Sequence, residues 1–112
     1  MALAAYEDVS TPRQEEIDLV STLLSDPLVV PRFCKPEFRE YSCFNSGVES
    51  VASKRIARLV SDRIFRYFET RIRGLVTDRR PLLISGGCGL NCDWNRSWLD
   101  SGLFTDVFVP PW

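Results

Sequence analysis

The most informative absence in this 112-residue chain is histidine, which does not occur at all. Without imidazole, the chain by itself cannot form a Ser-His-Asp triad, a Cys-His nucleophile or a His-ligated zinc site. Long apolar runs are also missing, and none approaches the roughly 20 residues of a membrane-spanning helix. The opening residues, MALAAYEDVS, lack the basic stretch and apolar core of a secretion signal. We therefore expect a cytoplasmic protein that does not associate with membranes.

An excess of charge of either sign is absent as well. The chain carries 14 basic and 15 acidic side chains, a net charge of −1, which argues against a general nucleic-acid binder. Apolar residues make up 45% and charged residues 26%, as in a globular protein, so the composition excludes disorder. The length allows one domain at most. The charge is nevertheless segregated, because residues 47–80 hold nine basic and four acidic groups.

The cysteines form two pairs in the sequence, Cys34 with Cys43 and Cys88 with Cys92. Because we expect no secretion signal, we expect reduced thiols rather than disulfides. The gaps of eight and three residues do not match the two-residue spacing of a zinc knuckle, and without histidine all four ligands would be thiolates. We therefore predict no metal site and interpret the cysteines as small, half-buried apolar side chains.

A first helix is predicted after Ser10 or Thr11, either of which can cap it, with Pro12 in its first turn. Its apolar face comprises Ile17, Val20, Leu23 and Leu24. The helix is expected to end at Asp26-Pro27, because the residue before proline avoids helical geometry. The proline-rich stretch 27–36 is expected to be extended or irregular.

A sustained apolar stripe predicts a long helix between Ser46 and Thr77, because apolar residues recur there every three or four positions. They are Val48, Val51, Ala52, Ile56, Leu59, Val60, Ile64, Phe68, Ile72 and Leu75. The opposite face is basic and holds Lys54, Arg55, Arg58, Arg66, Arg71 and Arg73. Since Glu49, Asp62 and Glu69 interrupt it, we interpret this face as solvated or as pairing with an acidic surface elsewhere.

Residues 81–112 indicate an α/β unit. Its predicted segments are a buried parallel strand at 82–85, a glycine-rich turn at 86–89, a helix at 90–99 and a second strand at 107–109. Ser101-Gly102 ends the helix. Trp94 and Trp98 lie four residues apart on it, which favours core packing over stacking on a base. In such units ligands bind at the carboxyl end of the strand.

The segment LLISGGCGLNCDWN, residues 82–95, is the candidate binding site. Glycines after a buried strand allow a close approach of backbone to ligand, and the following helix offers free N–H groups and a positive dipole end. Asn91 and Asn95 can donate and accept hydrogen bonds there. The pattern fits a phosphate, a ribose or an adenine edge. It fits equally well a turn whose glycines serve only to connect strand and helix.

The stretch SGGCGLNCDWNRSWLDSGLFTDVFVPP, residues 85–111, resembles the nucleotide-binding segment of O-carbamoyltransferases of the NodU/CmcH type, which act on antibiotic intermediates and nodulation factors. It is also similar to the related tRNA threonylcarbamoyl transferase domains of the actin-like (ASKHA) superfamily. MALAAY, residues 1–6, resembles a second segment of the family, and the helix from Ser46 resembles the helix before its Gly-Gly strand.

This resemblance implies ATP and carbamoyl phosphate as co-substrates. Family members form a carbamoyl-adenylate and pass the carbamoyl group to a hydroxyl, for example of a hydroxymethylcephem. Carried over position by position, the resemblance implies nucleotide contacts at Gly86, Gly87 and Asn91, with Gly89 permitting a close approach.

The chain departs from the family in length and in lacking the family's metal-binding histidines. We therefore expect residues 1–112 to form a single partial domain, an α/β piece of the actin-like fold, which is inactive on its own. The resemblance implies a metal ion only in the full-length protein, and we assign no catalytic residue to this chain. The remainder of the same domain is then its expected partner.

Two other functions are compatible with the residues. The stripe at 48–75 would suit a non-enzymatic domain that docks on a partner protein through its long amphipathic helix. A nucleic-acid binder would use arginines of the basic face, namely Arg55, Arg58, Arg66 and Arg73. The near-neutral net charge makes this the weaker alternative.

Overall fold

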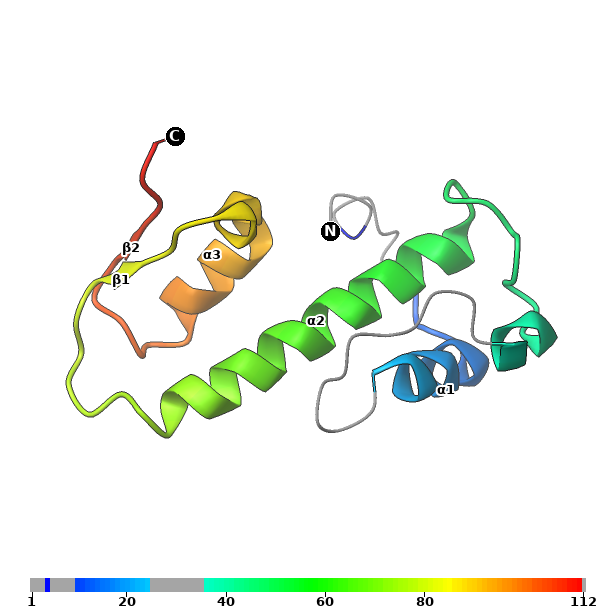
Figure 1. Ribbon diagram of the computed structural model, residues 1–112, viewed down its shortest axis with the longest axis horizontal. Helices are drawn as coiled ribbons and strands as arrows, with labels where there is room; N and C mark the ends of the chain where they lie inside the picture. The colour runs from blue at the N-terminus through cyan, green and yellow to red at the C-terminus, as the bar shows by residue number, and fades with distance from the viewer. Residues whose placement is uncertain (1–3, 5–9, 25–35, 112) are drawn as a thin grey trace. The chain divides into compact units, whose positions relative to one another are not determined.

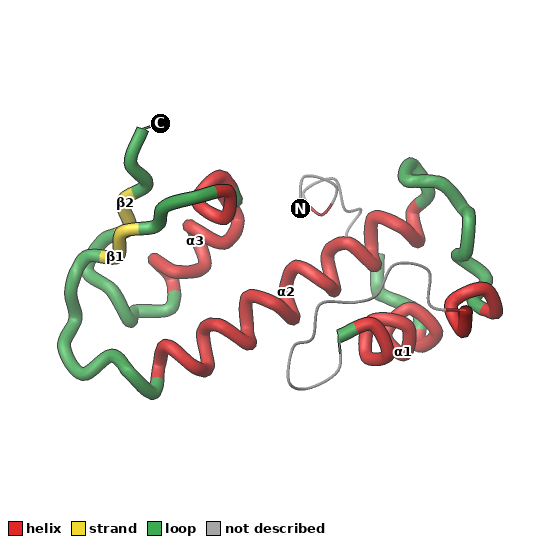
Figure 2. The backbone as a smooth tube through the Cα atoms, in the orientation of Figure 1, coloured by secondary structure: helices red, strands yellow, loops and turns green. Residues whose placement is uncertain are grey.

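The computed structural model describes residues 4, 10–24 and 36–111 (Figure 1). In this part of the chain the elements are, in order, α1 (Gln14–Leu23), a 3₁₀ helix (Pro36–Glu40), α2 (Val51–Arg73), β1 (Leu82–Leu83), a 3₁₀ helix (Gly87–Leu90), α3 (Cys92–Asp100) and β2 (Val107–Phe108) (Figure 2). The mixed helix and strand content confirms the predicted α/β class. The chain divides into two compact units, Met1–Ile64 and Phe65–Trp112, and α2 contributes to both. No helix within the described residues combines the length and hydropathy that a membrane crossing requires.

The first unit is built around α1, whose apolar face packs against the first half of α2. Leu19, Val20 and Leu24 are buried at its centre. Around them pack partly buried residues from α1, from the segment after it and from α2, namely Leu23, Phe38, Tyr41, Cys43, Ile56, Leu59, Val60 and Ile64. The apolar faces of both helices therefore meet in one small core. The predicted face of α1 is wrong at one position, because Ile17 is exposed and Leu19 is buried in its place.

The start of α1 differs from the prediction. Arg13 is the N-cap and the helix begins at Gln14, so Ser10 and Thr11 do not cap it and Pro12 lies before its first turn. The Arg13 N–H donates to Glu16 Oε2 at 2.9 Å. An acidic side chain in the first turn thus replaces the hydroxyl cap that the sequence suggested. At the other end α1 stops at Leu23, before the expected boundary at 26–27, which lies outside the described residues together with most of the proline-rich stretch.

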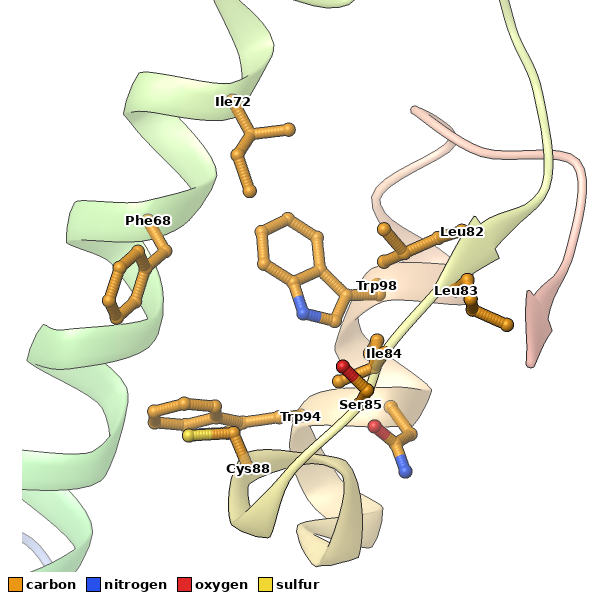
Figure 3. A pocket seen from close by; sticks show the side chains of 10 residues that line it. Phe68, Ile72, Leu82, Leu83, Ile84, Ser85, Cys88, Trp94 and Trp98 are labelled. Carbon is orange, nitrogen blue, oxygen red and sulfur yellow. The ribbon is translucent and has the colours of Figure 1, made fainter. Parts of the chain in front are cut away.

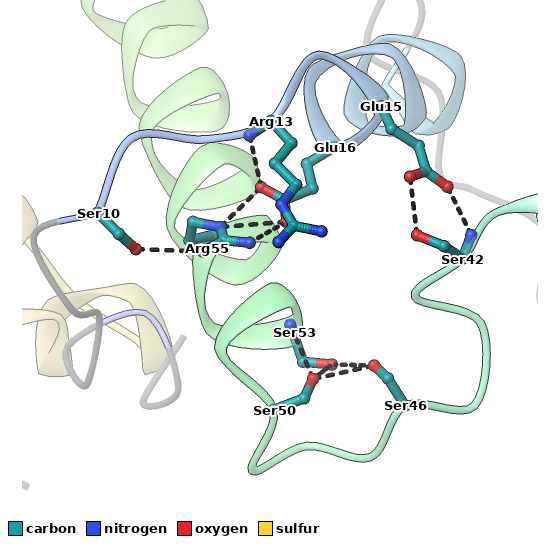
Figure 4. Close-up of polar contacts among 9 residues, drawn as sticks. All are labelled: Ser10, Arg13, Glu15, Glu16, Ser42, Ser46, Ser50, Ser53 and Arg55. Carbon is teal, nitrogen blue, oxygen red and sulfur yellow. Dashed lines mark hydrogen bonds and ion pairs between the residues drawn. The ribbon is translucent and has the colours of Figure 1, made fainter.

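A buried ion pair joins α1 to α2 (Figure 4). Arg55 donates from Nε to Glu16 Oε2 at 2.8 Å, and a second guanidinium nitrogen contacts Oε1. The side chains of Arg55 and Glu16 are only 9% and 4% exposed. Arg55 Nη1 also donates to Ser10 Oγ at 3.2 Å. The expectation that Arg55 belongs to a solvated basic face is therefore wrong, because this arginine is the buried partner of α1.

The helix α2 is shorter than the predicted 46–77. Asn45 and Gly47 adopt positive φ, and the helix starts only at Val51, after Ser50 Oγ accepts the N–H of Ser53 at 3.1 Å (Figure 4). It ends at Arg73, where Gly74 follows. Val48 and Leu75, the two ends of the predicted stripe, therefore lie outside the helix and are exposed.

The second unit is a parallel strand pair with α3 packed beside it. Leu82 is opposite Val107 and Leu83 is opposite Phe108, which confirms the predicted parallel pairing. Both strands are two residues long rather than the three or four expected. Leu83 is 64% exposed, so β1 is not buried on both faces as predicted. The helix α3 begins at Cys92 rather than at position 90.

Aromatic packing holds the second unit together. Trp94, Trp98 and Phe104 are buried, which confirms the predicted core role of the two tryptophans. The ring of Trp98 lies 4.6 Å from that of Phe65 and 5.8 Å from that of Phe104, measured between centroids. Phe65 is on α2, so the second half of that helix covers the tryptophans of α3.

We expect Arg55→Ala to lower the free energy of unfolding by about 3–5 kcal/mol, because the substitution leaves the Glu16 carboxylate buried without its partner. Urea unfolding followed by circular dichroism measures the loss. The matched control is Arg73→Ala, which removes the exposed pair with Glu69 on the same helix and should cost about 0.5 kcal/mol. Equal losses in the two variants would contradict a structural role for the buried pair.

The same pair predicts a loss of stability in acid. The hydrogen bond from Arg55 holds the pKa of Glu16 below its ordinary value, against the opposing effect of burial. A lowered carboxyl pKa stabilises the fold fully above about pH 4.5, and this contribution is lost as the pH falls through the folded-state pKa. The urea midpoint should therefore drop in acid less steeply for Glu16→Gln than for the unsubstituted chain. Glu15, whose pKa is lowered by its hydrogen bonds to Ser42, is present in both proteins and so cancels in the comparison.

Candidate functional site

The glycine-rich turn links the carboxyl end of β1 to the start of α3. Gly86 leaves the strand with φ 87° and ψ −175°, and the 3₁₀ helix Gly87–Leu90 follows at once. The Gly89 N–H donates to the Gly86 carbonyl at 3.0 Å and closes the turn. Asn91 then caps α3, because its Oδ1 accepts the N–H of Trp94 at 3.2 Å. The predicted strand–turn–helix arrangement is therefore present, and Gly87 and Gly89 lie within a 3₁₀ turn that precedes the helix.

The three glycines of the turn are there for different physical reasons. At Gly86 the backbone adopts a conformation that other residues reach only with strain. At Gly89, which is buried, a Cβ would lie 3.0 Å from Val109 Cγ1 and 3.3 Å from the Ile84 carbonyl oxygen. At Gly87 neither reason applies, because its φ is not positive and a Cβ would meet nothing within 4 Å.

Open space beside Gly87 is what a ligand-binding turn requires. The close approach that we predicted at Gly89 is made by Ile84 and Val109 of the protein itself. Gly89 thus allows the turn to pack closely against the strand residues Ile84 and Val109. Gly86 and Gly87 both leave room for another molecule, and Gly87 is the one of the two whose backbone conformation does not itself require glycine.

The charge around the turn disfavours a phosphate and is compatible with a nucleoside. Residues 85–100 contain one cation, Arg96, and it pairs with Asp100 at 2.9 Å. Asp93 occupies the first turn of α3, where its carboxylate offsets the positive end of the helix dipole. A phosphate group would therefore find no free cation on this segment. Of the three ligand groups that the sequence allowed, the ribose and the adenine edge are the better matches.

Asn95 supplies a hydrogen-bonding group behind the turn. Its Nδ2 donates to the Gly89 carbonyl at 2.8 Å. Its Oδ1 is buried and has no hydrogen-bond partner among the described residues. A buried acceptor of this kind is usually satisfied by a donor from water, ligand or protein.

An open pocket of about 370 Å³ lies between α2, β1 and α3 in the second unit (Figure 3). Its lining is mostly apolar and aromatic and consists of Phe68, Ile72, Leu82, Leu83, Ile84, Ser85, Cys88, Trp94, Asn95 and Trp98. The predicted contacts Gly86, Gly87, Gly89 and Asn91 are not among these residues. The pocket and the turn are neighbours that share a boundary at Ser85 and Cys88.

The cysteines differ from the prediction at two positions. Cys43 is half-buried as expected, but Cys88 and Cys92 are exposed free thiols. Cys88 lies within the turn and Cys92 is the first residue of α3. No apolar periodicity signalled burial there, so their position in the sequence could have indicated exposure. Cys34 lies outside the described residues. No cluster of three or more side chains that could hold a metal occurs within the residues described.

The parallel strand pair, the glycine-rich turn and the helices define an α/β protein. Comparison with known sequences makes the assignment specific: residues 37–112 match the family described as "Carbamoyltransferase N-terminus". The chain therefore belongs to the carbamoyltransferase family, which confirms the resemblance seen in residues 85–111.

Relatives with curated names agree with this assignment. The chain is 40% identical over 111 residues to proteins named 3'-hydroxymethylcephem-O-carbamoyltransferase from Amycolatopsis lactamdurans and Streptomyces clavuligerus. These matches cover 99% of this chain and 21% of each relative. Nodulation protein U of Azorhizobium caulinodans is 62% identical over 32 residues, which are 29% of this chain and 6% of that protein. The chain thus spans about a fifth of the cephem relatives that it matches. No solved structure matches it.

We expect alanine substitutions at the three glycines of the turn to differ in their effect on stability. Gly86→Ala and Gly89→Ala should each destabilise the chain, by about 1–3 kcal/mol for the strained backbone at position 86. Gly87→Ala should leave stability unchanged within about 0.5 kcal/mol, because its Cβ enters open space. Thermal unfolding of the three variants tests the order. A loss at position 87 as large as those at 86 and 89 would show that the turn needs glycine there for folding alone.

Proposed function

We propose that this chain is part of an ATP-dependent O-carbamoyltransferase and that its glycine-rich turn, residues 86–91, holds the adenosine part of the nucleotide. The observation that supports the proposal most directly is the open space at Gly87, in a turn whose other glycines are explained by backbone geometry and packing. The family membership supplies the reaction class. As part of the same proposal, the fold is a piece of an actin-like (ASKHA) domain, with residues 1–112 as a single partial domain.

The proposed reaction transfers a carbamoyl group to a hydroxyl. Water first releases phosphate from carbamoyl phosphate and leaves carbamate. A carbamate oxygen then bonds to the α-phosphorus of ATP while the bond to pyrophosphate breaks, which yields carbamoyl-adenylate and free pyrophosphate. The acceptor oxygen then bonds to the carbamoyl carbon, the bond from that carbon to the AMP oxygen breaks, and the hydroxyl proton leaves. The acceptor that we propose is a hydroxyl of an antibiotic intermediate such as a hydroxymethylcephem, the compound in the names of two relatives.

The role proposed for this chain is positional. Holding the adenosine fixes the leaving group relative to the acceptor, and such positioning contributes to rate without a reacting side chain. Gly86 and Gly87 would present backbone to the nucleoside, Asn91 would lie at the helix end, and Gly89 would keep the turn against the strands. We assign no catalytic residue to the chain and expect it to be inactive alone.

We propose no metal site in this part of the protein. The chain has no histidine, and its described residues contain no cluster of three metal-ligating side chains. Any metal ion of the reaction would therefore be bound by other parts of a longer protein, and no step of the proposal runs through it. We expect the protein in the cytoplasm, where ATP and carbamoyl phosphate are available.

The two alternative functions find less support. Part of the long stripe packs on the core of the first unit, namely Ile56, Leu59, Val60 and Ile64. These side chains are therefore not available to dock on a partner protein. Among the four arginines of the nucleic-acid alternative, Arg55 pairs with Glu16, Arg58 with Asp62 and Arg73 with Glu69, while Arg66 has no ion pair with the described residues. Ion-paired arginines are poorly suited to phosphate binding, so we retain the nucleotide proposal.

Titration calorimetry of the folded chain with AMP and ATP tests the proposal. We expect both nucleotides to bind, and Gly87→Trp to abolish binding because the indole would fill the open space. Gly74→Trp is the matched control: this exposed glycine follows α2, and its Cβ would make only an ordinary contact, 3.6 Å from the Arg71 carbonyl oxygen. Nucleotide binding that survives Gly87→Trp, or a folded chain that binds neither nucleotide, would contradict a site formed by the turn.

A further inference from the structure

The side chain of Asn95 connects α3 to the glycine-rich turn. Its Nδ2 donates to the Gly89 carbonyl at 2.8 Å, six residues earlier in the chain. Its backbone N–H donates to the Asn91 carbonyl at 3.0 Å, as in an ordinary α-helix. Asn95 therefore belongs to the regular part of α3, and its side chain extends back to hold a carbonyl group of the turn.

The composition of the turn makes a bond from outside it important. Its three glycines have more conformational freedom than other residues, so fixing them costs more entropy. The Gly89 N–H donates to the Gly86 carbonyl at 3.0 Å. The Asn91 N–H donates to the Cys88 carbonyl at 3.1 Å. Such local bonds close the turn, but they do not reach into α3. The bond from Asn95 does, because its donor lies on that helix.

The two polar atoms of the Asn95 amide differ in their surroundings. Nδ2 is paired with the turn, whereas Oδ1 is buried and has no hydrogen-bond partner among the described residues. A buried acceptor without a partner destabilises the folded state. A leucine of similar size would avoid this cost, but it could not bond the turn. A residue that costs stability in this way is typical of functional positions, where activity and stability impose different demands.

We propose that Asn95 is a positioning residue of the nucleotide site. By holding the Gly89 carbonyl, it keeps the turn in the conformation in which Gly87 borders open space. A turn that is ordered before the ligand arrives binds more tightly, because the entropic cost of ordering is not taken from the binding free energy. Asn95 acts through Gly89 and does not itself bond the nucleotide. The inference rests on the nucleotide-binding role proposed for the turn.

Titration calorimetry of the folded chain with AMP tests this role. Asn95→Leu should raise the dissociation constant for AMP about tenfold, which is the effect of losing one hydrogen bond. It should leave the melting temperature within about 5 °C of that of the unsubstituted chain. Asn95→Ala is a second variant that adds no bulk and should weaken AMP binding similarly. The matched control is Ser97→Ala, which removes the bond from Ser97 Oγ to the Asp93 carbonyl at 2.9 Å on the same helix and should leave the affinity unchanged.

Hydrogen exchange without nucleotide gives a second readout. The Gly89 N–H is buried and bonded to the Gly86 carbonyl, so it reports on opening of the turn. We expect this amide to exchange about tenfold faster in Asn95→Leu, because the turn opens more often once the Gly89 carbonyl is released. Ser97→Ala should leave the rate unchanged. This readout needs no ligand, so it tests the link between Asn95 and the turn separately from nucleotide binding.

The possible results separate this proposal from the proposed function. An unchanged AMP affinity in Asn95→Leu, or an unchanged exchange rate at Gly89, would overturn the positioning role and leave the nucleotide site standing. If Asn95→Leu and Asn95→Ala both fail to fold, Asn95 is a structural residue and the proposal is wrong. A folded unsubstituted chain that binds neither AMP nor ATP would contradict the nucleotide site itself, and the positioning role would fall with it.

Discussion

The rest of the second unit depends on two backbone hydrogen bonds that join its two strands. The N–H groups of Leu82 and Ile84 donate these bonds to the segment that follows α3. They require the chain to return through α3 and to lie parallel to β1. They also set the position at which the turn leaves the sheet. Because Gly89 sits between Ile84 and Val109 without room for a Cβ, the turn is held against both strands at once. The position of Gly87 at the exposed side of the turn follows from this packing.

The two units are stabilised in different ways. In the first, the ion pair of Glu16 with Arg55 is buried between α1 and α2, beside an apolar core that includes residues of both helices. In the second, aromatic rings from α2 and α3 pack around Trp98, while one face of the strand pair stays exposed. The second unit therefore combines the candidate site with the surfaces that remain open, and both of our proposals concern it.

The charges around this turn favour a neutral ligand group over a phosphate. Glycine-rich turns after a strand are commonly read as phosphate sites, because the next helix supplies N–H groups and a positive end. Here Asp93 and the internal pair of Arg96 with Asp100 remove that advantage. A neutral ribose or adenine edge is not repelled by these carboxylates and needs no cation to neutralise it. The adenosine role implied by the family resemblance and the electrostatics of the turn thus agree, although they come from independent observations.

The sequence by itself determined the local features: most of the apolar face of α1, the long α2, the strand–turn–helix order and the family, whose motif lies in residues 85–111. These depend on residues within a few positions of one another, where periodicity and glycine placement are sufficient signals. Only the tertiary structure decided that Arg55 is buried and that Gly89 is a packing residue. Glu16 lies 39 residues from Arg55, and Val109 lies 20 residues from Gly89. Such contacts depend on where distant parts of the chain come together, which no local pattern specifies.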